Sequence, residues 1–429
     1  MKVLVVGNGG REHALAWKLI QSEKVDQVLC VPGNGGTASL AHCQNLPGSV
    51  TNFEQIGQFV QEHCISLVVV GPELPLALGI TDYLQTQGIP VFGPTQAGAQ
   101  IEASKSWAKD LMQAARVPTA KARTFTAAAA AKAYVKEQGA PIVIKADGLA
   151  AGKGVTVATT VEAATAAIDA AFQGQFGAAG DQVLIEEYLS GQEVSVLALT
   201  DGLTIRPLLP AQDHKRIGEG DTGANTGGMG AYAPVPLVTP ELMDRIQQEI
   251  LEPVLQSLRS RQIDYRGVLY AGLMITPEGN PKVIEFNCRF GDPETQTILP
   301  LLATPLETLL LACAEQRLAH LPAIAWKSGV SVCVVMAAGG YPGDYLKGQP
   351  ITGIEQAEAL GALVLHAGTQ LQQQLITDGG RVLSVTACDQ TFAQALERAY
   401  AAVDCIQFEN RYYRRDIGYS VRSVDSVIA

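Results

Sequence analysis

The chain has 429 residues, a formal net charge of −11 and an apolar content of 47%. At roughly 150 residues per domain, this length predicts two to four domains with buried cores. The negative charge argues against a general affinity for nucleic acid or acidic membranes. The longest apolar runs, such as 330–338, are far shorter than the ~20 residues that a membrane helix needs. The eight cysteines stand singly, without Cys-x-x-Cys or zinc-type spacing, which favours reduced thiols.

The first hundred residues alternate apolar runs with amphipathic stretches. The predicted strands are 3–6, 28–31, 67–70 and 90–92, and the predicted helices are 13–21, 53–63 and 76–87. The first run is too short for the core of a signal peptide and is read as a strand. Alternating strands and helices predict a doubly wound α/β domain with a parallel sheet. Pro94 closes this domain, and a helix near Ser104 opens the next.

The middle of the chain predicts a small α+β unit that ends near Tyr188. Its helices are 126–138 and a second from 161, and its strands are 142–145, 155–158 and 183–187. Further predicted elements are a hairpin of 193–200 and 204–208, a long glycine-rich loop over 213–232, a helix over 240–258 and strands 267–275 and 282–286. Beyond Pro322 we expect a strand over 330–337, short strands and a helix over 392–403.

A glycine-rich turn, Gly7 to Glu12, follows the first strand and opens a helix. Such a turn lets backbone N–H groups approach an anion at the positive end of the helix. It is similar to a dinucleotide-binding turn, but Glu12 replaces the third glycine and no acid follows the second strand to hold a ribose. We expect Gly9 and Gly10 to contact a phosphate or another part of a substrate. The alternative is a purely structural turn.

The segment 142–155 places Lys145 at the end of a buried strand, followed by a loop of glycines and alanines. A buried ammonium group needs a partner, because burying it alone is very costly. The loop through Gly152, Lys153 and Gly154 has little side-chain bulk and can fold over a triphosphate. It is not a Walker A motif, because a strand and not a helix follows it. The alternative is a flexible surface turn with a solvated lysine.

The next strand, 183–187, ends in Glu186 and Glu187 and bends at Tyr188 and Leu189. Such a bend can offer backbone groups to adenine and a carboxylate to ribose hydroxyls. The alternative is an ordinary solvated strand end.

The segment 282–294 gives the strongest indication of a site. Glu285, Asn287 and Arg289 alternate along a strand, so they project from one face. A carboxylate and an amide oxygen are hard ligands suited to Mg²⁺. The arginine beside them offers a planar fork that matches a carboxylate or an acyl phosphate. An exposed polar strand face is a poor alternative, because the residues in between are apolar.

In this order, the strand lysine, the glycine loop, the Glu-Glu-x-Leu bend and the Glu-x-Asn-x-Arg strand resemble the ATP-grasp superfamily. Within it, Arg289-Phe290-Gly291-Asp292-Pro293-Glu294 resembles the signature of the glycinamide ribonucleotide synthetase family. The segments 7–13 and 213–232 support this resemblance, which covers essentially the whole chain.

The resemblance implies an α/β and α+β architecture, an ATP-grasp fold with three domains. These are an N-terminal α/β substrate-binding domain with a doubly wound parallel sheet (1–103), an ATP-grasp domain (104–324) and a C-terminal α+β domain (325–429). A lid subdomain is expected over about 123–190.

The resemblance also implies the ligation of glycine to 5-phosphoribosylamine through glycyl phosphate, with ATP as co-substrate and Mg²⁺ or Mn²⁺ as cofactor. The implied ATP-binding residues are Lys105, Lys145, Gly152, Lys153, Gly154, Glu186, Glu187, Leu189 and Glu193. The implied metal ligands are Glu285 and Asn287, and the implied catalytic residues are Arg289 and Lys145. The implied substrate-binding residues are Gly9, Gly10, Asp213, Arg289, Asp292 and Arg381.

Two features leave alternatives open. Many ATP-grasp relatives carry an acidic metal ligand about twelve residues before the glutamate, where this chain has Leu273, so a two-metal site built from carboxylates is in doubt. Thr377 to Arg381 forms a glycine turn that could hold the sugar phosphate, but an ordinary hairpin turn with a solvated arginine fits the sequence equally well.

The competing functions are another ATP-grasp carboxylate–amine ligase of nucleotide metabolism, an NAD-binding oxidoreductase and a non-catalytic nucleotide-binding regulator. The missing third glycine, and the missing acidic residue that would bind a ribose hydroxyl, count against an NAD-binding oxidoreductase. The intact lysines, metal ligands and arginine count against a non-catalytic regulator. We expect a monomeric cytoplasmic enzyme of small molecules, with no nucleic-acid or membrane partner.

Overall fold

The structure is a computed structural model that describes residues 1–149 and 154–423. Its N-terminal region is a five-stranded parallel sheet with the order β3-β2-β1-β4-β5. The strands are β1 (Lys2–Gly7), β2 (Gln27–Pro32), β3 (Cys43–Asn45), β4 (Leu67–Val70) and β5 (Val91–Phe92), and the first helices are α1 (Gly10–Leu19) and α2 (Phe53–Glu62). The doubly wound parallel sheet is therefore confirmed. The edge strand β3 was not predicted, because Cys-Gln-Asn has no apolar run.

Two helical regions differ from the predictions. The stretch expected as one helix over 76–87 is divided into α3 (Glu73–Ala77) and α4 (Ile80–Gln85), because Gly79 between them has a left-handed φ of 92°. Before the expected helix α6 (Lys105–Ala114) lies a further helix, α5 (Gln96–Ala103). The Ser104 side chain separates these two helices by accepting a hydrogen bond from the Trp107 N–H, as a helix cap does.

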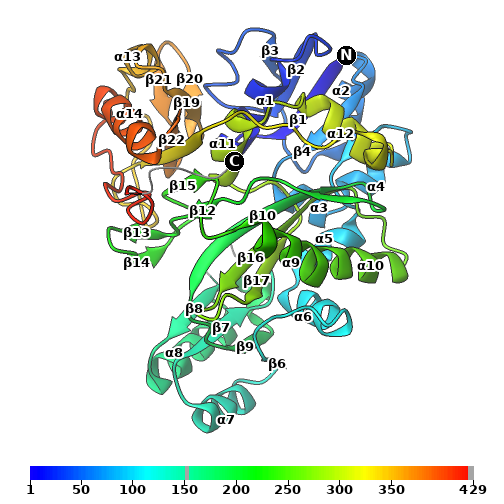
Figure 1. The fold of residues 1–429 in the computed structure, drawn as a ribbon, viewed down its shortest axis with the longest axis vertical. Coiled ribbons are helices and arrows are strands. Elements are labelled where there is room, and N and C mark those ends of the chain that lie inside the picture. The colour runs from blue at the N-terminus through cyan, green and yellow to red at the C-terminus, as the bar shows by residue number, and fades with distance from the viewer. Residues whose placement is uncertain (150–153, 424–429) are drawn as a thin grey trace.

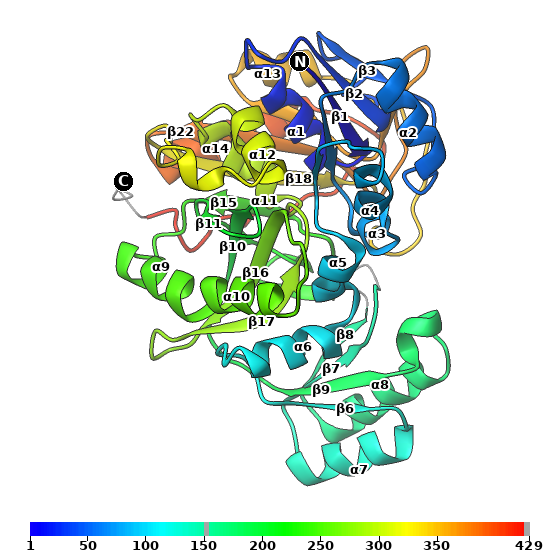
Figure 2. The same ribbon diagram turned by 90° about the vertical axis from the view of Figure 1, so that its right-hand side faces the viewer.

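The small unit of the middle region lies at the far end of the molecule from the N-terminal sheet in both views (Figure 1 and Figure 2). Its sheet has the order β6-β9-β7-β8, with β6 (Ala122–Phe125), β7 (Ile142–Ala146), β8 (Val155–Ala158) and β9 (Val183–Glu187). Helices α7 (Ala128–Gln138) and α8 (Val161–Phe172) form a separate hydrophobic core with this sheet. Because β7 and β8 pair antiparallel, the glycine loop joins a hairpin, as expected.

A second four-stranded sheet lies between that unit and the rest of the molecule (Figure 1). Its order is β11-β10-β16-β17, with β10 (Gln192–Thr200), β11 (Ile205–Pro207), β16 (Gly267–Ile275) and β17 (Pro281–Asn287). The expected helix over 240–258 is present as α9 (Pro240–Ile246), a π-helical turn (Gln247–Leu251) and α10 (Glu252–Ser260). Glu285 and Asn287, the predicted metal ligands, thus lie on the edge strand β17 of this sheet.

The third sheet crosses the boundary expected at 324 and 325. Its order is β12-β15-β18-β22-β19, with β12 (Gln212–Asp213), β15 (Gly230–Ala233), β18 (Val330–Ala337), β22 (Arg381–Asp389) and β19 (Leu363–His366). The prediction of an unstructured loop over 213–232 is wrong, because this stretch contains β12, β15 and the hairpin β13 (Arg216–Gly218) and β14 (Thr222–Asn225). Its strands are two to four residues long, and β15 is positioned by β18, a hundred residues away.

The remaining elements complete the C-terminal half. They are α11 (Glu294–Ile298), α12 (Leu306–Ala314), α13 (Ile354–Ala359), β20 (Thr369–Leu371), β21 (Leu375–Thr377) and α14 (Phe392–Cys405), which packs on β18 and β22. No helix in the described part of the chain is long and apolar enough to cross a membrane. All eight cysteines are free thiols.

Candidate active site

A chain of buried charges connects the small unit to the second sheet. Glu186 on β9 lies between two lysines, with Lys145 Nζ and Lys109 Nζ each 2.7 Å from one of its oxygens. Lys145 Nζ also donates to the Ile284 carbonyl oxygen of β17 at 2.9 Å. The partner that the buried lysine was expected to need is therefore Glu186. Because that carboxylate is committed to two lysines, it is not free to bind ribose.

Glu285 and Asn287 lie next to this contact on β17. Burial acts to raise the pKa of Glu285, but the ammonium groups of Lys215, Lys145 and Lys105 outweigh it and hold the pKa below its ordinary value. The site therefore keeps an ionised carboxylate within a concentration of positive charge. Such a combination suits a triphosphate together with a cation.

The donors present fit a divalent metal bound partly by substrate. Glu285 and Asn287 offer one carboxylate and one amide oxygen, and the described residues contain no cluster of three or more His, Cys, Asp or Glu suited to a metal. Leu273 is fully buried and pairs with Val283, so β16 adds no acidic ligand. Gly272 faces Glu285 instead and leaves it room, because a Cβ there would lie 3.2 Å from Glu285 Cγ. Mg²⁺ commonly completes such a site with phosphate oxygens and water.

Lys105 is held at the mouth of the glycine loop. Its ammonium group donates to the Gly148 carbonyl at 2.8 Å, and its backbone N–H donates to Asp147 Oδ1 at 2.5 Å. Gly154 lies where β8 begins, whereas Gly152 and Lys153 lie outside the described residues. Lys105, Lys145 and Glu285 are thus brought together, as their proposed roles require.

The acidic bend after β9 is connected to the same region through Lys215. Glu187 accepts a hydrogen bond from the Lys121 backbone at 3.1 Å, and Leu189 beyond it is half-buried. Glu193 at the start of β10 pairs with Lys215 Nζ at 3.0 Å. Lys215 also lies 3.6 Å from Glu285, so it links the bend to the metal-ligand segment.

Arg289 lies beyond the end of β17 and is already paired. Its guanidinium is 2.8 Å from Glu102 and 3.3 Å from Glu73. Glu102 also accepts the Cys288 N–H at 2.8 Å, so the arginine is held in place by two helices of the N-terminal half. It also approaches Asn287 Oδ1, at 3.4 Å, which places it beside the metal-ligand pair.

The N-terminal glycine turn meets the Arg289–Glu294 segment. A Cβ on Gly9 would lie 3.4 Å from Asp292 Oδ2, and one on Gly10 would lie 2.6 Å from Gln296 Nε2. A larger residue at either position would therefore crowd Asp292 or Gln296, and glycine allows the two segments to approach closely. The Gly9 N–H donates to Glu12 at 2.6 Å, so this donor is committed within the turn.

Arg381 and Asp213 complete this second group of residues. Arg381 Nη1 donates to the Gly227 carbonyl at 2.6 Å and to the Asp292 carbonyl at 2.8 Å, so the alternative of a solvated arginine is wrong. One Asp213 oxygen is buried and has no hydrogen-bond partner among the residues that the structure describes, and it lies beside Gly228. Burial, reinforced by Glu294, raises the pKa of Asp213 well above its ordinary value.

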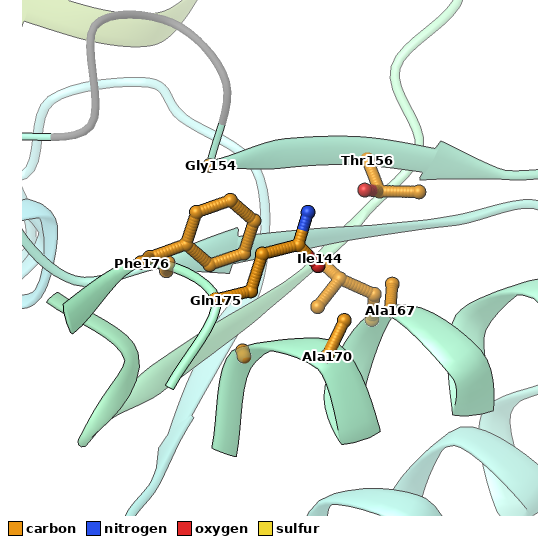
Figure 3. A pocket seen from close by; sticks show the side chains of 9 residues that line it. Ile144, Gly154, Thr156, Ala167, Ala170, Gln175 and Phe176 are labelled. Carbon is orange, nitrogen blue, oxygen red and sulfur yellow. The ribbon is translucent and has the colours of Figure 1, made fainter. Parts of the chain in front are cut away.

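A small cavity of about 120 Å³ lies inside the small unit, apart from the charged residues described above. Gln175 and Phe176 reach over it from the turn after α8, toward Gly154 (Figure 3). Ile144 and Ala146 line it, so the intervening Lys145 points to the opposite face of β7. The cavity is too small for a nucleotide and lies behind the face that carries the charged residues.

Sequence reasoning missed several partners of the predicted residues. Glu73 opens α3 shortly after the end of β4, and the rule that ligands gather at strand ends could have found it. Lys109 is one helical turn after Lys105, which places both on one face of α6. Glu102 was missed because α5 was not predicted, and Tyr270, which donates to Glu294, has no local pattern that would reveal it.

Comparison with known proteins decides the family. Three family models match successive parts of the chain, namely the N domain (1–102), the ATP-grasp (A) domain (103–295) and the C domain (331–420) of phosphoribosylglycinamide synthetase. The chain belongs to the phosphoribosylglycinamide synthetase family. A phosphoribosylamine–glycine ligase of Nostoc is 71% identical over 425 residues, covering 99% of this chain and all of that protein. The Escherichia coli phosphoribosylamine–glycine ligase is 49% identical over 422 residues, covering 98% of both chains.

Solved structures confirm the ATP-grasp fold. The phosphoribosylamine–glycine ligase of Thermotoga maritima has a TM-score of 0.84 and 32% identity, covering 97% of this chain and all of that one. A biotin carboxylase from Campylobacter jejuni has a TM-score of 0.72 at 15% identity, covering 96% and 92%, and shows the shared fold alone.

Proposed function

We propose that this synthetase-family chain joins the carboxylate of glycine to the amine of 5-phosphoribosylamine, forming glycinamide ribonucleotide, ADP and phosphate in purine biosynthesis. The observation that carries the proposal is the contact of Lys145 with Ile284. It brings the phosphate-binding lysine of the small unit to the strand that carries Glu285 and Asn287, in a chain that matches the family along its length.

The nucleotide lies, in this proposal, between the small unit and the second sheet. Lys105 and Lys145 neutralise the phosphates, and Gly152, Lys153 and Gly154 close over the terminal one. Glu187, Leu189 and Glu193 contact the nucleoside, whereas Glu186 acts through the lysines that it pairs. This family uses ATP and a divalent metal, and Mg²⁺ is the ion that an Asn and Glu pair fits best.

Glu285 and Asn287 would hold the metal, which would neutralise the charge that develops on the phosphates. The glycine carboxylate oxygen attacks the γ-phosphorus, and the bond to ADP breaks. The substrate amine then attacks the carbonyl carbon of glycyl phosphate and displaces phosphate. Arg289, fixed by Glu73 and Glu102, stabilises charge on the acyl phosphate. The small unit acts as a lid that excludes water from this intermediate.

The sugar phosphate and glycine occupy the second group of residues. Arg381 and Gly10 face the sugar phosphate, while Asp292 contacts the substrate away from its phosphate and holds Arg381. Asp213 binds the glycine ammonium group. Gly9 contributes close approach of the backbone, because its N–H already donates to Glu12. The protein acts as a cytoplasmic monomer in this proposal.

The decisive experiment is ATP turnover with glycine and freshly generated phosphoribosylamine, omitting each in turn. Release of ADP that needs both substrates, with glycinamide ribonucleotide detected by mass, supports the proposal. ADP release with a different amine acceptor, and none with phosphoribosylamine, would favour another ATP-grasp ligase of nucleotide metabolism.

A further inference from the structure

The hairpin β13–β14 lies between the two segments that carry site residues. Asp213 and Lys215 precede it, and Gly227 and Gly228 follow it. Its ends are joined where Thr226 donates from its backbone N–H to the Lys215 carbonyl at 2.8 Å. Any displacement of the hairpin therefore moves residues on both flanks, including Lys215 beside Glu285 and the carbonyl that binds Arg381.

The hairpin cannot hold this position by itself. It is a separate two-stranded sheet, β13 is only half-buried and most of β14 is exposed. An isolated hairpin of this kind is marginally stable in water. Something outside the hairpin must therefore fix it.

That fixed point is Arg414, whose side chain is 0% exposed. Its guanidinium binds both oxygens of Asp416, at 2.8 and 2.7 Å, and reaches Asp221 of the hairpin turn at 2.7 Å. It also donates to the Arg216 carbonyl of β13 at 3.0 Å. A planar guanidinium can satisfy all four acceptors at once, which an ammonium group cannot do.

Neighbours of Arg414 add further contacts to the same hairpin. The Gly220 N–H donates to Asp416 at 2.8 Å, and the Tyr412 hydroxyl donates to the Ile217 carbonyl at 2.7 Å. On the other side, the Arg414 carbonyl accepts from Tyr400 of α14 at 2.9 Å, so the arginine itself is anchored to the C-terminal helix.

We infer that Arg414 is a positioning residue for the ligation, which holds the β13–β14 hairpin so that Asp213, Lys215 and Gly227–Gly228 face the substrates. It acts through these residues and touches no reacting group. This inference rests on the proposed function for its catalytic consequence, whereas its mechanical part stands on the hairpin contacts alone.

The test compares Arg414→Met, Arg414→Lys and Asp221→Asn with the wild type. Arg398→Met serves as a matched control, because Arg398 pairs with Asp389 in the same region and has no contact with the hairpin. Hydrogen exchange over 216–225 should rise at least tenfold in Arg414→Met and less in Arg414→Lys and Asp221→Asn. Exchange over 392–405 should stay at the wild-type rate.

The kinetic measurement separates positioning from general damage. In Arg414→Met, kcat/KM for glycine should fall 10- to 100-fold, with partial recovery in Arg414→Lys. The Kd for ADP should rise much less than kcat/KM for glycine falls, because Lys105, Lys145 and Glu186 have no contact with the hairpin and only Lys215 links it to Glu193 and Glu285. Unchanged hairpin exchange, or an equal loss of ADP binding and ligation, would overturn the inference. If the wild type fails to ligate glycine to phosphoribosylamine, the proposed function fails. The exchange measurement still tests whether Arg414 holds the β13–β14 hairpin in place.

Discussion

At the scale of single residues, the candidate site is organised by paired charges. Glu186 forms ion pairs with two lysines, and Arg289 with two glutamates. Lys215 pairs with Glu193 and Glu285. Each pairing fixes a side chain before substrate arrives, so little reorganisation is needed when phosphate charge enters. The sequence identified both members of the Lys145–Glu186 pair, because a strand or motif marks each of them. It missed the partners that only tertiary contacts supply, which are Lys109, Lys215, Glu73 and Glu102.

The first prediction concerns the proposed metal ligand. Glu285→Gln removes one negative charge at nearly constant volume, so kcat should fall on the order of 100-fold, or ~2.7 kcal/mol. The Mg²⁺ concentration that gives half-maximal turnover should rise, because the site loses its only proposed carboxylate ligand. Glu278→Gln, on the exposed turn between β16 and β17, is the control and should behave as wild type. Full activity of Glu285→Gln at limiting Mg²⁺ would contradict the assignment.

The second prediction concerns Asp213, whose pKa is raised mainly by burial. A carboxyl whose pKa is higher in the folded than in the unfolded state lowers the free energy of unfolding as pH rises above its ordinary pKa. It has no such cost at lower pH, where it is protonated in both states. Asp213→Asn should therefore melt at a higher temperature than wild type at pH 8, and the difference should shrink toward pH 4. Its kcat/KM for glycine should fall. Thermal scans at both pH values, with exposed Asp110→Asn as control, measure this.

At the scale of elements, the outcome depends on how each element is specified. The strands β4, β7, β9 and β16 were predicted closely, because their own apolar residues and flanking glycines define them. The short strands β12 and β15 were not, because their pairing with distant β18 is what makes them strands. The same reason explains the site, where the residues of the motifs were found, whereas partners outside the motifs, such as Glu102 on α5 and Lys109 on α6, were not.

The third prediction concerns the attachment of the small unit to α6. Lys109→Met leaves Glu186 with one lysine and removes a donor from Thr119, which Lys109 binds at 2.7 Å. Breaking one partner of a buried pair should cost about 3 kcal/mol in the free energy of unfolding. Urea denaturation measures this change. Lys132→Met, which breaks the partly exposed pair with Asp169 in the same unit, should cost less than about 1 kcal/mol. Equal costs would show that burial of the first pair has no effect.

At the scale of the whole molecule, the N-terminal sheet and the C-terminal sheet are joined by neutral histidines. His13 on α1 accepts a hydrogen bond at Nδ1 from the His366 backbone N–H of β19 at 2.7 Å. The Asn34 side chain donates to the His366 carbonyl at 2.8 Å. Burial lowers the pKa of both histidines, with His366 at about 4. The junction between the two ends of the chain therefore requires uncharged rings.

The fourth prediction follows from the sign of these shifts. A histidine with a lowered folded-state pKa adds stability above its ordinary value of about 6.5 and loses it as pH falls toward the folded value. Between pH 7.5 and 5, His366 alone should cost the protein about 2 kcal/mol of unfolding free energy. Urea denaturation at the two pH values, at constant ionic strength, measures the loss.

His366 Nδ1 lies 3.1 Å from Thr369 Oγ1, and His366→Asn keeps a polar side chain at this position that cannot titrate. Its stability should therefore fall by about 2 kcal/mol less than that of wild type over the same pH range. Exposed His320→Asn is the control and should retain the wild-type loss. The comparison uses the change with pH, so it is independent of any fixed cost of the substitution at neutral pH. An identical loss in His366→Asn and wild type would mean that acid acts elsewhere than at the junction of the two sheets.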